Sequence, residues 1–302
     1  PVMSHTFKAI LITGATGQVG YELCRSLSVF GPILSPNRAE LDLADANSVD
    51  AYLAKHQPDL IVNPAAWTAV DAAEANQEAA ERLNNALPLQ LAQYARKTNA
   101  YLIHYSTDYV YPGTGQNSWL ESDAVAPLSV YGRTKLGGDE AVVNHCLHYL
   151  IFRTSWVYSD RGNNFMKTML KLGAQRESLS IVDDQFGAPT NARLIAQITA
   201  LAVYRQLAGK PIDSGLYHLV CGGITRWYGF AEQIFELAKH KNLPLLLNKL
   251  GGISTAQFPT PATRPANSRL DVSKLELALG IVLPNWQQQL ELTLNNYLDK
   301  KE

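Results

Sequence analysis

The sequence is poor in the features that mark membrane proteins, secreted proteins and nucleic-acid-binding proteins. Its 302 residues carry a formal net charge of −1, and no run of five like charges offers a patch for nucleic acid or a lipid surface. No apolar run reaches the roughly 18 residues that a membrane span needs. The N-terminal segment "PVMSHTFK" has no apolar core of signal-peptide length. We therefore expect no nucleic-acid partner and no membrane partner.

Cysteine is also scarce. Cys24, Cys146 and Cys221 are widely spaced and odd in number, which matches neither a metal-binding pattern nor a disulfide pattern. We expect all three to serve in packing and the protein to be cytoplasmic, where thiols stay reduced. With 46% hydrophobic and 18% charged residues, the composition is that of an ordinary globular protein.

Apolar, β-branched runs alternate with segments of helical spacing in the first half of the chain. The pattern predicts strands at 8–14, 32–35, 59–66, 100–111 and 148–158, and helices at 18–31, 44–58, 78–99 and 129–146. This alternation implies crossover connections and a parallel sheet. We therefore predict an α/β fold, a doubly wound, Rossmann-like sheet that forms a dinucleotide-binding domain over residues 1–160. Residues 161–302, richer in proline and glycine, are expected to form a smaller, interleaved substrate-binding region with some segments returning to the sheet.

A glycine motif follows the first expected strand. In "GATGQVG", Gly14, Gly17 and Gly20 lie between that strand and the next helix. Gly14 permits a tight turn, Gly17 lets the backbone approach a pyrophosphate, and Gly20 allows close helix packing. An ordinary glycine turn is the alternative, but the order of strand, turn and helix favours a dinucleotide site.

The end of the second expected strand lacks the acidic residue that usually binds the ribose of NAD. It reads "SPNRAELD", with no carboxylate before Glu40. Arg38 is placed instead to meet a 2′-phosphate, unless it is only a solvated surface charge. We predict NADPH as the coenzyme, with NADH as the second option.

Tyr131 and Lys135 are four residues apart on an expected helix and therefore share a face. A lysine cation, together with the positive nicotinamide ring of an oxidised cofactor, favours phenolate, so we expect a lowered pKa for Tyr131. A tyrosine tuned in this way can give a proton to a carbonyl oxygen during reduction. Ser106 and Thr107, at the carboxyl end of an expected strand, supply hydroxyls to hold that oxygen.

These motifs resemble the extended short-chain dehydrogenase/reductase superfamily, in "GATGQVG", "STDYVYPG", "VYGRTK" and "RTSWVY". The chain is more closely similar to the dTDP-4-dehydrorhamnose reductase family. Further segments of that family appear in order as "NPAAWTAVDAAE", "GNNFMKTML", "DQFGAPT", "GLYHL" and "RPANSRLD". Together they extend from Gly14 to about Trp286, so the resemblance covers nearly the whole chain.

The resemblance implies an enzyme that reduces the 4-keto group of dTDP-4-dehydro-β-L-rhamnose to dTDP-β-L-rhamnose with NAD(P)H, in dTDP-rhamnose and cell-surface polysaccharide biosynthesis. By similarity, Tyr131 donates the proton, Lys135 holds the nicotinamide ribose and tunes Tyr131, and Thr107 bonds the reacting oxygen. Asp108 and Trp156 would contact the substrate, with a loop cap and a core aromatic as the respective alternatives. The full set of predicted cofactor residues is Gly14, Gly17, Gln18, Val19, Asn37, Arg38, Asp42, Leu43, Ala66, Trp67, Thr68, Tyr105, Tyr131 and Lys135.

Two departures from the family pattern bear on the coenzyme and on metal. Many relatives have Asp where this chain has Asn37, which favours NADPH. Some relatives form dimers around Mg²⁺ held by glutamates; Glu22 matches one such position, and Arg193 stands at another. Because a cation there would repel Mg²⁺, we predict no bridging metal and interpret Glu22 as a solvated helix residue. The chain is expected to be a monomer or a homodimer.

Two other functions stay open. An epimerase or dehydratase of the same superfamily also uses tyrosine and lysine, but it retains the nucleotide and returns the hydride to the sugar. A non-catalytic binding subunit, such as the regulatory β subunit of methionine adenosyltransferase, also resembles this family. The intact Thr107, Tyr131 and Lys135 argue against the second alternative.

Overall fold

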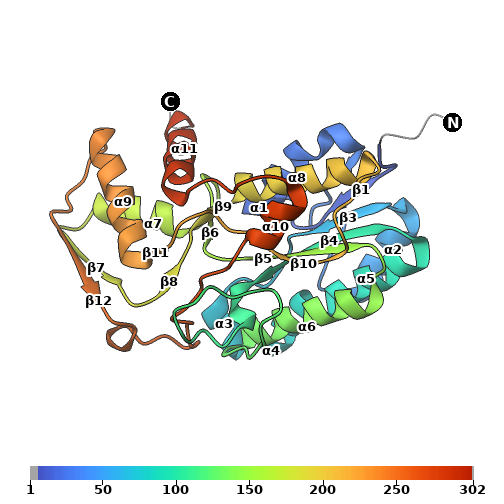
Figure 1. Cartoon of the computed structure of the whole chain (residues 1–302), viewed down its shortest axis with the longest axis horizontal. Coiled ribbons are helices and arrows are strands. Elements are labelled where there is room, and N and C mark those ends of the chain that lie inside the picture. Colours follow the sequence, from blue (N-terminus) through green and yellow to red (C-terminus); the bar gives the residue numbers. More distant parts are fainter. Residues whose placement is uncertain (1–5, 301–302) are drawn as a thin grey trace.

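The computed structural model describes residues 6–300 and builds them around a six-stranded parallel sheet (Figure 1). The strand order is β10-β5-β4-β3-β1-β2. The strands are β1 (Ile10–Ile12), β2 (Ile33–Leu34), β3 (Leu60–Asn63), β4 (Tyr101–Thr107), β5 (Tyr149–Thr154) and β10 (Gly215–His218). β1, β3 and β4 are buried along their whole length, as expected for parallel strands covered on both faces.

Helices cover both faces of this sheet (Figure 1). On one face lie α1 (Gln18–Ser26), α8 (Ala192–Leu207) and α10 (Ser273–Leu279), which share the larger apolar core with the sheet. On the other face lie α2 (Ala46–His56), α5 (Leu87–Thr98) and α6 (Val130–His145), which form a separate apolar cluster. The predicted α/β, doubly wound fold is therefore confirmed.

A second region lies at the left of Figure 1. Its helices are α7 (Phe165–Gly173), α9 (Trp227–His240) and α11 (Trp286–Asp299), and its parallel strand pairs are β7 (Ser178–Val182) with β12 (Lys249–Ile253) and β6 (Val157–Tyr158) with β9 (Thr190–Asn191). The antiparallel pair is β8 (Phe186–Gly187) with β11 (Thr225–Arg226), and short 3₁₀ turns are η1 (Ser28–Phe30) and η4 (Thr255–Gln257). Three elements from the second half of the chain return to the first region. β10 is a strand of the six-stranded sheet, and α8 and α10 pack against that sheet (Figure 1). The domain boundary at residue 160 stays a prediction.

The helix predicted at 78–99 is confirmed, because helical backbone continues from Gln77 to Thr98 with one π-helical turn inside it. α3 (Val70–Ala75) and α4 (Gln77–Glu81) are followed by a π-helical turn, η2 (Arg82–Ala86), before α5 begins. Pro88 has no N–H to bond the carbonyl of Asn84 four residues earlier, which favours a widened turn. α6 packs closely there, because a Cβ at Gly138 would lie 2.1 Å from the Asn84 carbonyl oxygen.

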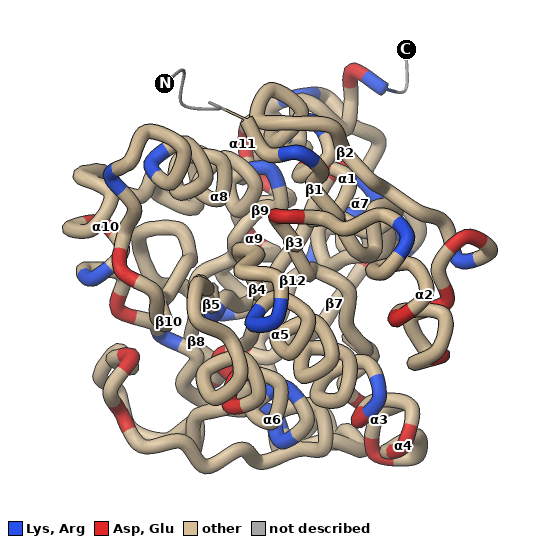
Figure 2. The backbone as a smooth tube through the Cα atoms, turned by 90° about the vertical axis from the view of Figure 1, so that its right-hand side faces the viewer, with Lys and Arg blue, Asp and Glu red and all other residues tan. Residues whose placement is uncertain are grey.

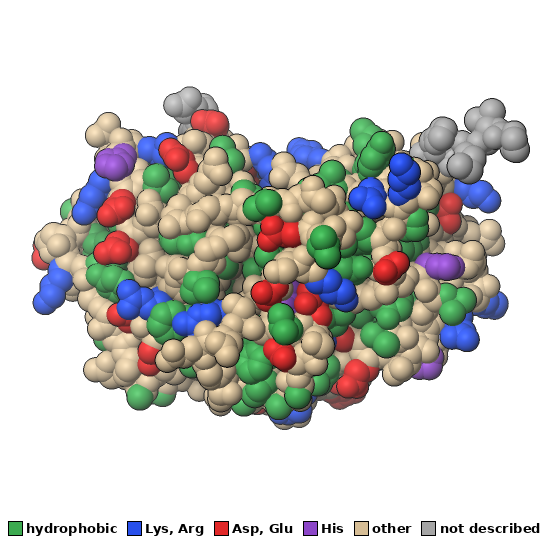
Figure 3. All heavy atoms as spheres, viewed as in Figure 1, with side chains coloured by type: hydrophobic (Ala, Val, Ile, Leu, Met, Phe, Trp, Pro, Cys, Tyr) green, Lys and Arg blue, Asp and Glu red, His purple; other side chains and the backbone are tan. Residues whose placement is uncertain are grey.

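Basic and acidic residues are distributed over the whole backbone (Figure 2), and their side chains are interspersed on the face shown in Figure 3. Within residues 6–300, no helix has both the length and the apolar character of a membrane span. Cys146 and Cys221 are buried, Cys24 is half-buried, and all three thiols are free, in line with a packing role. The first five residues, part of the N-terminal segment expected to lack a signal-type core, lie outside the described residues.

Candidate active site

The carboxyl ends of the parallel strands open into a cleft of about 1810 Å³. It spans the point between β1 and β3 where the strand order reverses, which is where ligands bind in open α/β sheets. The cleft is lined by every predicted site residue, namely Gly14, Gly17, Gln18, Val19, Asn37, Arg38, Asp42, Leu43, Ala66, Trp67, Thr68, Tyr105, Thr107, Asp108, Tyr131, Lys135 and Trp156. The structure thus brings the predicted residues together, while their individual roles stay predictions.

The glycine turn has the geometry that the motif requires. Gly14 has φ +57°, a left-handed conformation that favours glycine. A Cβ at Gly20 would lie 2.1 Å from the Gly14 carbonyl oxygen, so α1 approaches the turn more closely than any side chain allows. Gly17 is the N-cap residue of α1, and no side chain forms a capping hydrogen bond there. The first N–H groups of α1 are therefore left for an anionic ligand.

The loop after β2 presents Arg38 at the other side of the cleft. The Asn37 side-chain oxygen accepts from the N–H groups of Ala39 and Glu40, at 2.9 and 3.0 Å. Asn37 thereby shapes its own turn. The Arg38 side chain is 86% exposed, and its Nε lies 3.9 Å from Asp42 Oδ1. Such a loose, solvated pair leaves the guanidinium available to a ligand.

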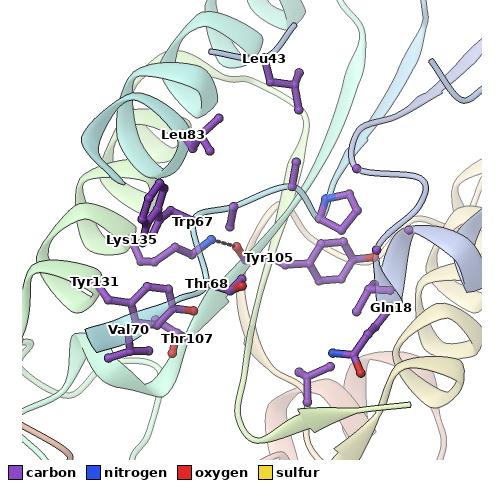
Figure 4. A pocket seen from close by; sticks show the side chains of 18 of the residues that line it. Gln18, Leu43, Trp67, Thr68, Val70, Leu83, Tyr105, Thr107, Tyr131 and Lys135 are labelled. Carbon is purple, nitrogen blue, oxygen red and sulfur yellow. Dashed lines mark hydrogen bonds between the residues drawn. The ribbon is translucent and has the colours of Figure 1, made fainter. Parts of the chain in front are cut away.

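The helix that carries the tyrosine and lysine is held at its N-terminus. Ser129 Oγ accepts from the Gly132 N–H at 3.1 Å, so α6 begins one residue before Tyr131. A Cβ at Gly132 would lie 2.4 Å from the Tyr109 carbonyl oxygen, so this turn presses against η3 (Asp108–Val110). One turn further along, Lys135 Nζ donates to the Tyr105 carbonyl at 2.5 Å (Figure 4).

Burial controls the ionisation of Tyr131 and Lys135. It raises the pKa of Tyr131 to about 12, although hydrogen bonding with Thr107 opposes this rise and Asp108 and Asp139 add to it. It lowers the pKa of Lys135 to about 8, and Asp139 opposes this fall. The expected lowering of the Tyr131 pKa is thus wrong for the cofactor-free chain, because desolvation outweighs any nearby cation. A phenol that stays protonated at neutral pH is the form that can donate a proton.

Thr107 and Asp108 lie beside Tyr131 at the end of β4. Thr107 Oγ1 donates to Asp108 Oδ1 at 3.3 Å and accepts from the Tyr109 N–H at 3.2 Å. Burial raises the pKa of Asp108 to about 7. Asp108 Oδ2 is buried and makes no hydrogen bond of standard geometry with the described residues, although the nearby Ser268 hydroxyl opposes the rise of the Asp108 pKa. This oxygen can therefore accept from a polar ligand atom.

The strand predicted at 148–158 breaks at Trp156, so that prediction is wrong at this residue. Trp156 has φ +50°, an unusual conformation for a bulky side chain. The backbone turns there between β5 and β6, and the indole stacks on Trp227 with ring centroids 3.9 Å apart. A Cβ at Gly187 would lie 2.9 Å from the indole, so glycine makes room for it. Both tryptophans line the cleft.

Sequence reasoning missed Trp227 and Asn84. Asn84 is fully buried in η2, where its Oδ1 accepts from the Trp67 N–H at 2.8 Å. Its Nδ2 donates to the Trp67 carbonyl at 3.2 Å and to Thr134 Oγ1 at 3.0 Å, so it ties the cleft wall to α6. Pro88, four residues after Asn84, was the available signal, whereas no spacing links Trp227 to the site.

Glu22 is not solvated, so the sequence interpretation of this residue is wrong. It is 3% exposed, and its Oε2 lies 3.3 Å from Arg193 Nε. The two residues come from α1 and α8, which pack against each other over the sheet. The Arg193 guanidinium therefore forms an ion pair with the Glu22 carboxylate, which would otherwise attract a cation.

Comparison with known proteins gives a consistent result over nearly the whole chain. The family model described as the RmlD substrate binding domain matches residues 8–299. The chain is 48% identical over 290 residues to a dTDP-4-dehydrorhamnose reductase of Shigella flexneri, covering 95% of this chain and 97% of that protein. A crystal structure of a dTDP-4-dehydrorhamnose reductase from Clostridium acetobutylicum superposes with a TM-score of 0.87 at 35% identity, covering 95% and 98% of the two chains. A dTDP-4-dehydrorhamnose reductase from Bacillus anthracis, in complex with NADP, superposes with a TM-score of 0.85 at 31% identity, covering 96% and 99%.

These matches confirm the family resemblance that the motifs predicted. The matched range, residues 8–299, includes the glycine turn, the helix of Tyr131 and Lys135 and the second region. The chain therefore belongs to the dTDP-4-dehydrorhamnose reductase family.

Proposed function

We propose that this protein reduces the 4-keto group of dTDP-4-dehydro-β-L-rhamnose to dTDP-β-L-rhamnose with NADPH, in dTDP-rhamnose and cell-surface polysaccharide biosynthesis. The observation that carries the proposal is the convergence of Thr107, Tyr131 and Lys135 in one cleft of a chain that belongs to this family. The cytoplasmic location and the monomeric or dimeric state stay predictions.

The cleft fits a dinucleotide. The uncapped N-terminus of α1 and the close approach at Gly20 leave room and donors for a pyrophosphate. Lys135 would hold the nicotinamide ribose, and Arg38 would meet a 2′-phosphate. When bound, the reduced coenzyme supplies the hydride.

The side chains around Tyr131 suit a proton transfer to the sugar. Tyr131 would donate its phenolic proton to the keto oxygen as that oxygen gains negative charge, and Thr107 would hold the same oxygen by a hydrogen bond. Burial keeps Tyr131 protonated at neutral pH, which is the form that the reduction requires. The Oδ2 of Asp108 would accept from a sugar hydroxyl, and the Trp156 indole would pack on the sugar or its nucleotide.

The test is a turnover assay with purified protein, NADPH and dTDP-4-dehydrorhamnose. We expect stoichiometric oxidation of NADPH and a product identified by NMR as dTDP-L-rhamnose. An epimerase or dehydratase would convert the sugar without net oxidation of NADPH. A regulatory subunit would bind NADPH without turnover, and either result would contradict the proposal.

Arg38→Ala should raise KM for NADPH about 10-fold or more and leave KM for NADH nearly unchanged, because one charge-assisted phosphate contact contributes roughly 1.5–3 kcal/mol. The measurement is steady-state kinetics with both coenzymes. Arg96→Ala, at an exposed arginine of α5, is the matched control and should change neither value. Equal effects of Arg38→Ala on both coenzymes would make Arg38 a bystander.

A further inference from the structure

Buried polar side chains form a chain of contacts across the sheet beneath Lys135. The contacts follow the strand order from β1 through β3, β4 and β5 to β10. At the centre stands Asp139 of α6, 2% exposed, four residues after Lys135. Residues four apart on a helix share a face, so Tyr131, Lys135 and Asp139 follow one another along it. Charged groups this deep need compensation from their neighbours.

The buried side chains between β1 and β4 determine which ring nitrogen of His104 carries the proton. Thr13 Oγ1 donates to Asn63 Oδ1 at 2.7 Å, and the Asn63 amide nitrogen lies 3.1 Å from His104 Nδ1. Since an amide nitrogen only donates, Nδ1 accepts and the ring proton sits on Nε2. That Nε2 lies 3.9 Å from Asp139 Oδ1. Burial and Lys135 hold the pKa of His104 well below its usual range, so the ring is neutral.

The contacts on the β5 side keep Asp139 ionised. Asp139 Oδ2 accepts from Ser106 Oγ at 2.8 Å and from Arg153 Nε at 3.0 Å. Arg153 Nη1 in turn donates to the Tyr111 hydroxyl at 2.8 Å. Burial raises the pKa of Asp139, while Arg153, Ser106 and Lys135 oppose this rise. Donors on a carboxylate favour its charged form.

The remaining acidic groups near α6 are engaged elsewhere. Glu74 of α3 accepts from the Val130 N–H at 3.0 Å, and Glu81 of α4 accepts from Asn85 at 2.5 Å. Asp108 of η3 accepts from Thr107 and acts on the pKa of Tyr131. Among the described residues, Asp139 is thus the carboxylate that offsets the burial of the Lys135 ammonium.

We propose that Asp139 is a positioning residue that keeps Lys135 in its ammonium form, so that Lys135 can hold the cofactor ribose beside Tyr131. This inference rests on the proposed function and extends it from the groups that touch the ligand to a counter-ion behind them. Without Asp139, Lys135 would lose its proton at a lower pH, because only burial would act on it.

The test is the pH dependence of NADPH binding in Asp139→Asn, which removes the charge and keeps the shape. Binding is measured by the tryptophan fluorescence of the cleft over about pH 5 to 10. We expect the pH at which affinity falls to move down by about 1 to 3 units relative to wild type. The charge-conserving Asp139→Glu should restore the wild-type position of that fall. A fall that stays in place in Asp139→Asn overturns the proposal.

Tyr111→Phe is the matched control, because it removes a hydrogen bond from the same network and leaves the Asp139 charge. It should lower the melting temperature without moving the pH at which affinity falls, and an equal shift would mean that any damage to the network suffices. If Asp139→Asn does not fold, because Arg153 is left without its counter-ion, the double variant Asp139→Asn, Arg153→Met removes both charges. The same downward shift is expected there, and its absence overturns the proposal.

The two proposals fail in different ways. A wild-type protein that binds NADPH but does not oxidise it with the sugar overturns the proposed function, and the binding titration still reports on Asp139. An unshifted titration in a protein that reduces the sugar overturns the role of Asp139 alone.

Discussion

Tyr131→Phe is expected to lower kcat about 10²-fold or more, the scale of a lost general acid. Phenylalanine keeps the ring and its edge-to-face contact with Tyr109, whose ring centroid lies 5.4 Å away, so folding should be preserved. NADPH binding should change little, because phenylalanine keeps the ring and Lys135 stays in place to hold the nicotinamide ribose. The measurements are kcat under saturating substrates and the Kd of NADPH.

Tyr109→Phe provides the matched control, since it removes a hydroxyl from the other tyrosine of the same aromatic pair. It should leave kcat within a few-fold of wild type. Near-wild-type turnover in Tyr131→Phe would show that another group donates the proton.

Lys135→Met is expected to weaken NADPH binding about 10-fold or more, because hydrogen bonds from a charged donor contribute roughly 1.5–3 kcal/mol. It should also move the alkaline limb of activity to higher pH, even as the maximal rate falls. Burial lowers the pKa of Lys135 to about 8 and raises that of Tyr131 to about 12. In the cofactor-free chain, the ammonium is therefore the first of the two to lose its proton as pH rises, and methionine has none to lose.

The test is kcat against pH at saturating NADPH for wild type and Lys135→Met. Lys135→Arg should rescue binding only in part, because it keeps the charge but replaces a compact ammonium with a wide planar fork. An alkaline limb that stays in place in Lys135→Met would leave Lys135 as a ribose anchor without a part in the pH dependence.

Residue type and short-range spacing were sufficient to predict the glycine turn and the helix face that carries Tyr131 and Lys135. The turn at Gly14 and the close approach at Gly20 follow from residue type and spacing, and the structure has both. The shared face of Tyr131 and Lys135 follows from helical periodicity. The strand predicted at 148–158 failed at Trp156, where stacking on the distant Trp227 outweighs local propensity.

By itself, the sequence determined the alternation of strands and helices, the glycine turn, the tyrosine–lysine pair and the family, because each depends on residue type at short spacing or on an ordered set of motifs. Only the tertiary structure decided that Trp227 stacks on Trp156, that Arg193 pairs with a buried Glu22, and that Ser106 and Arg153 donate to Asp139. In the cofactor-free chain, packing also raises the pKa of Tyr131, where a lowered pKa was expected. The physical reason is that desolvation and contact between distant segments exist only once the chain is packed, so no spacing in the sequence records them.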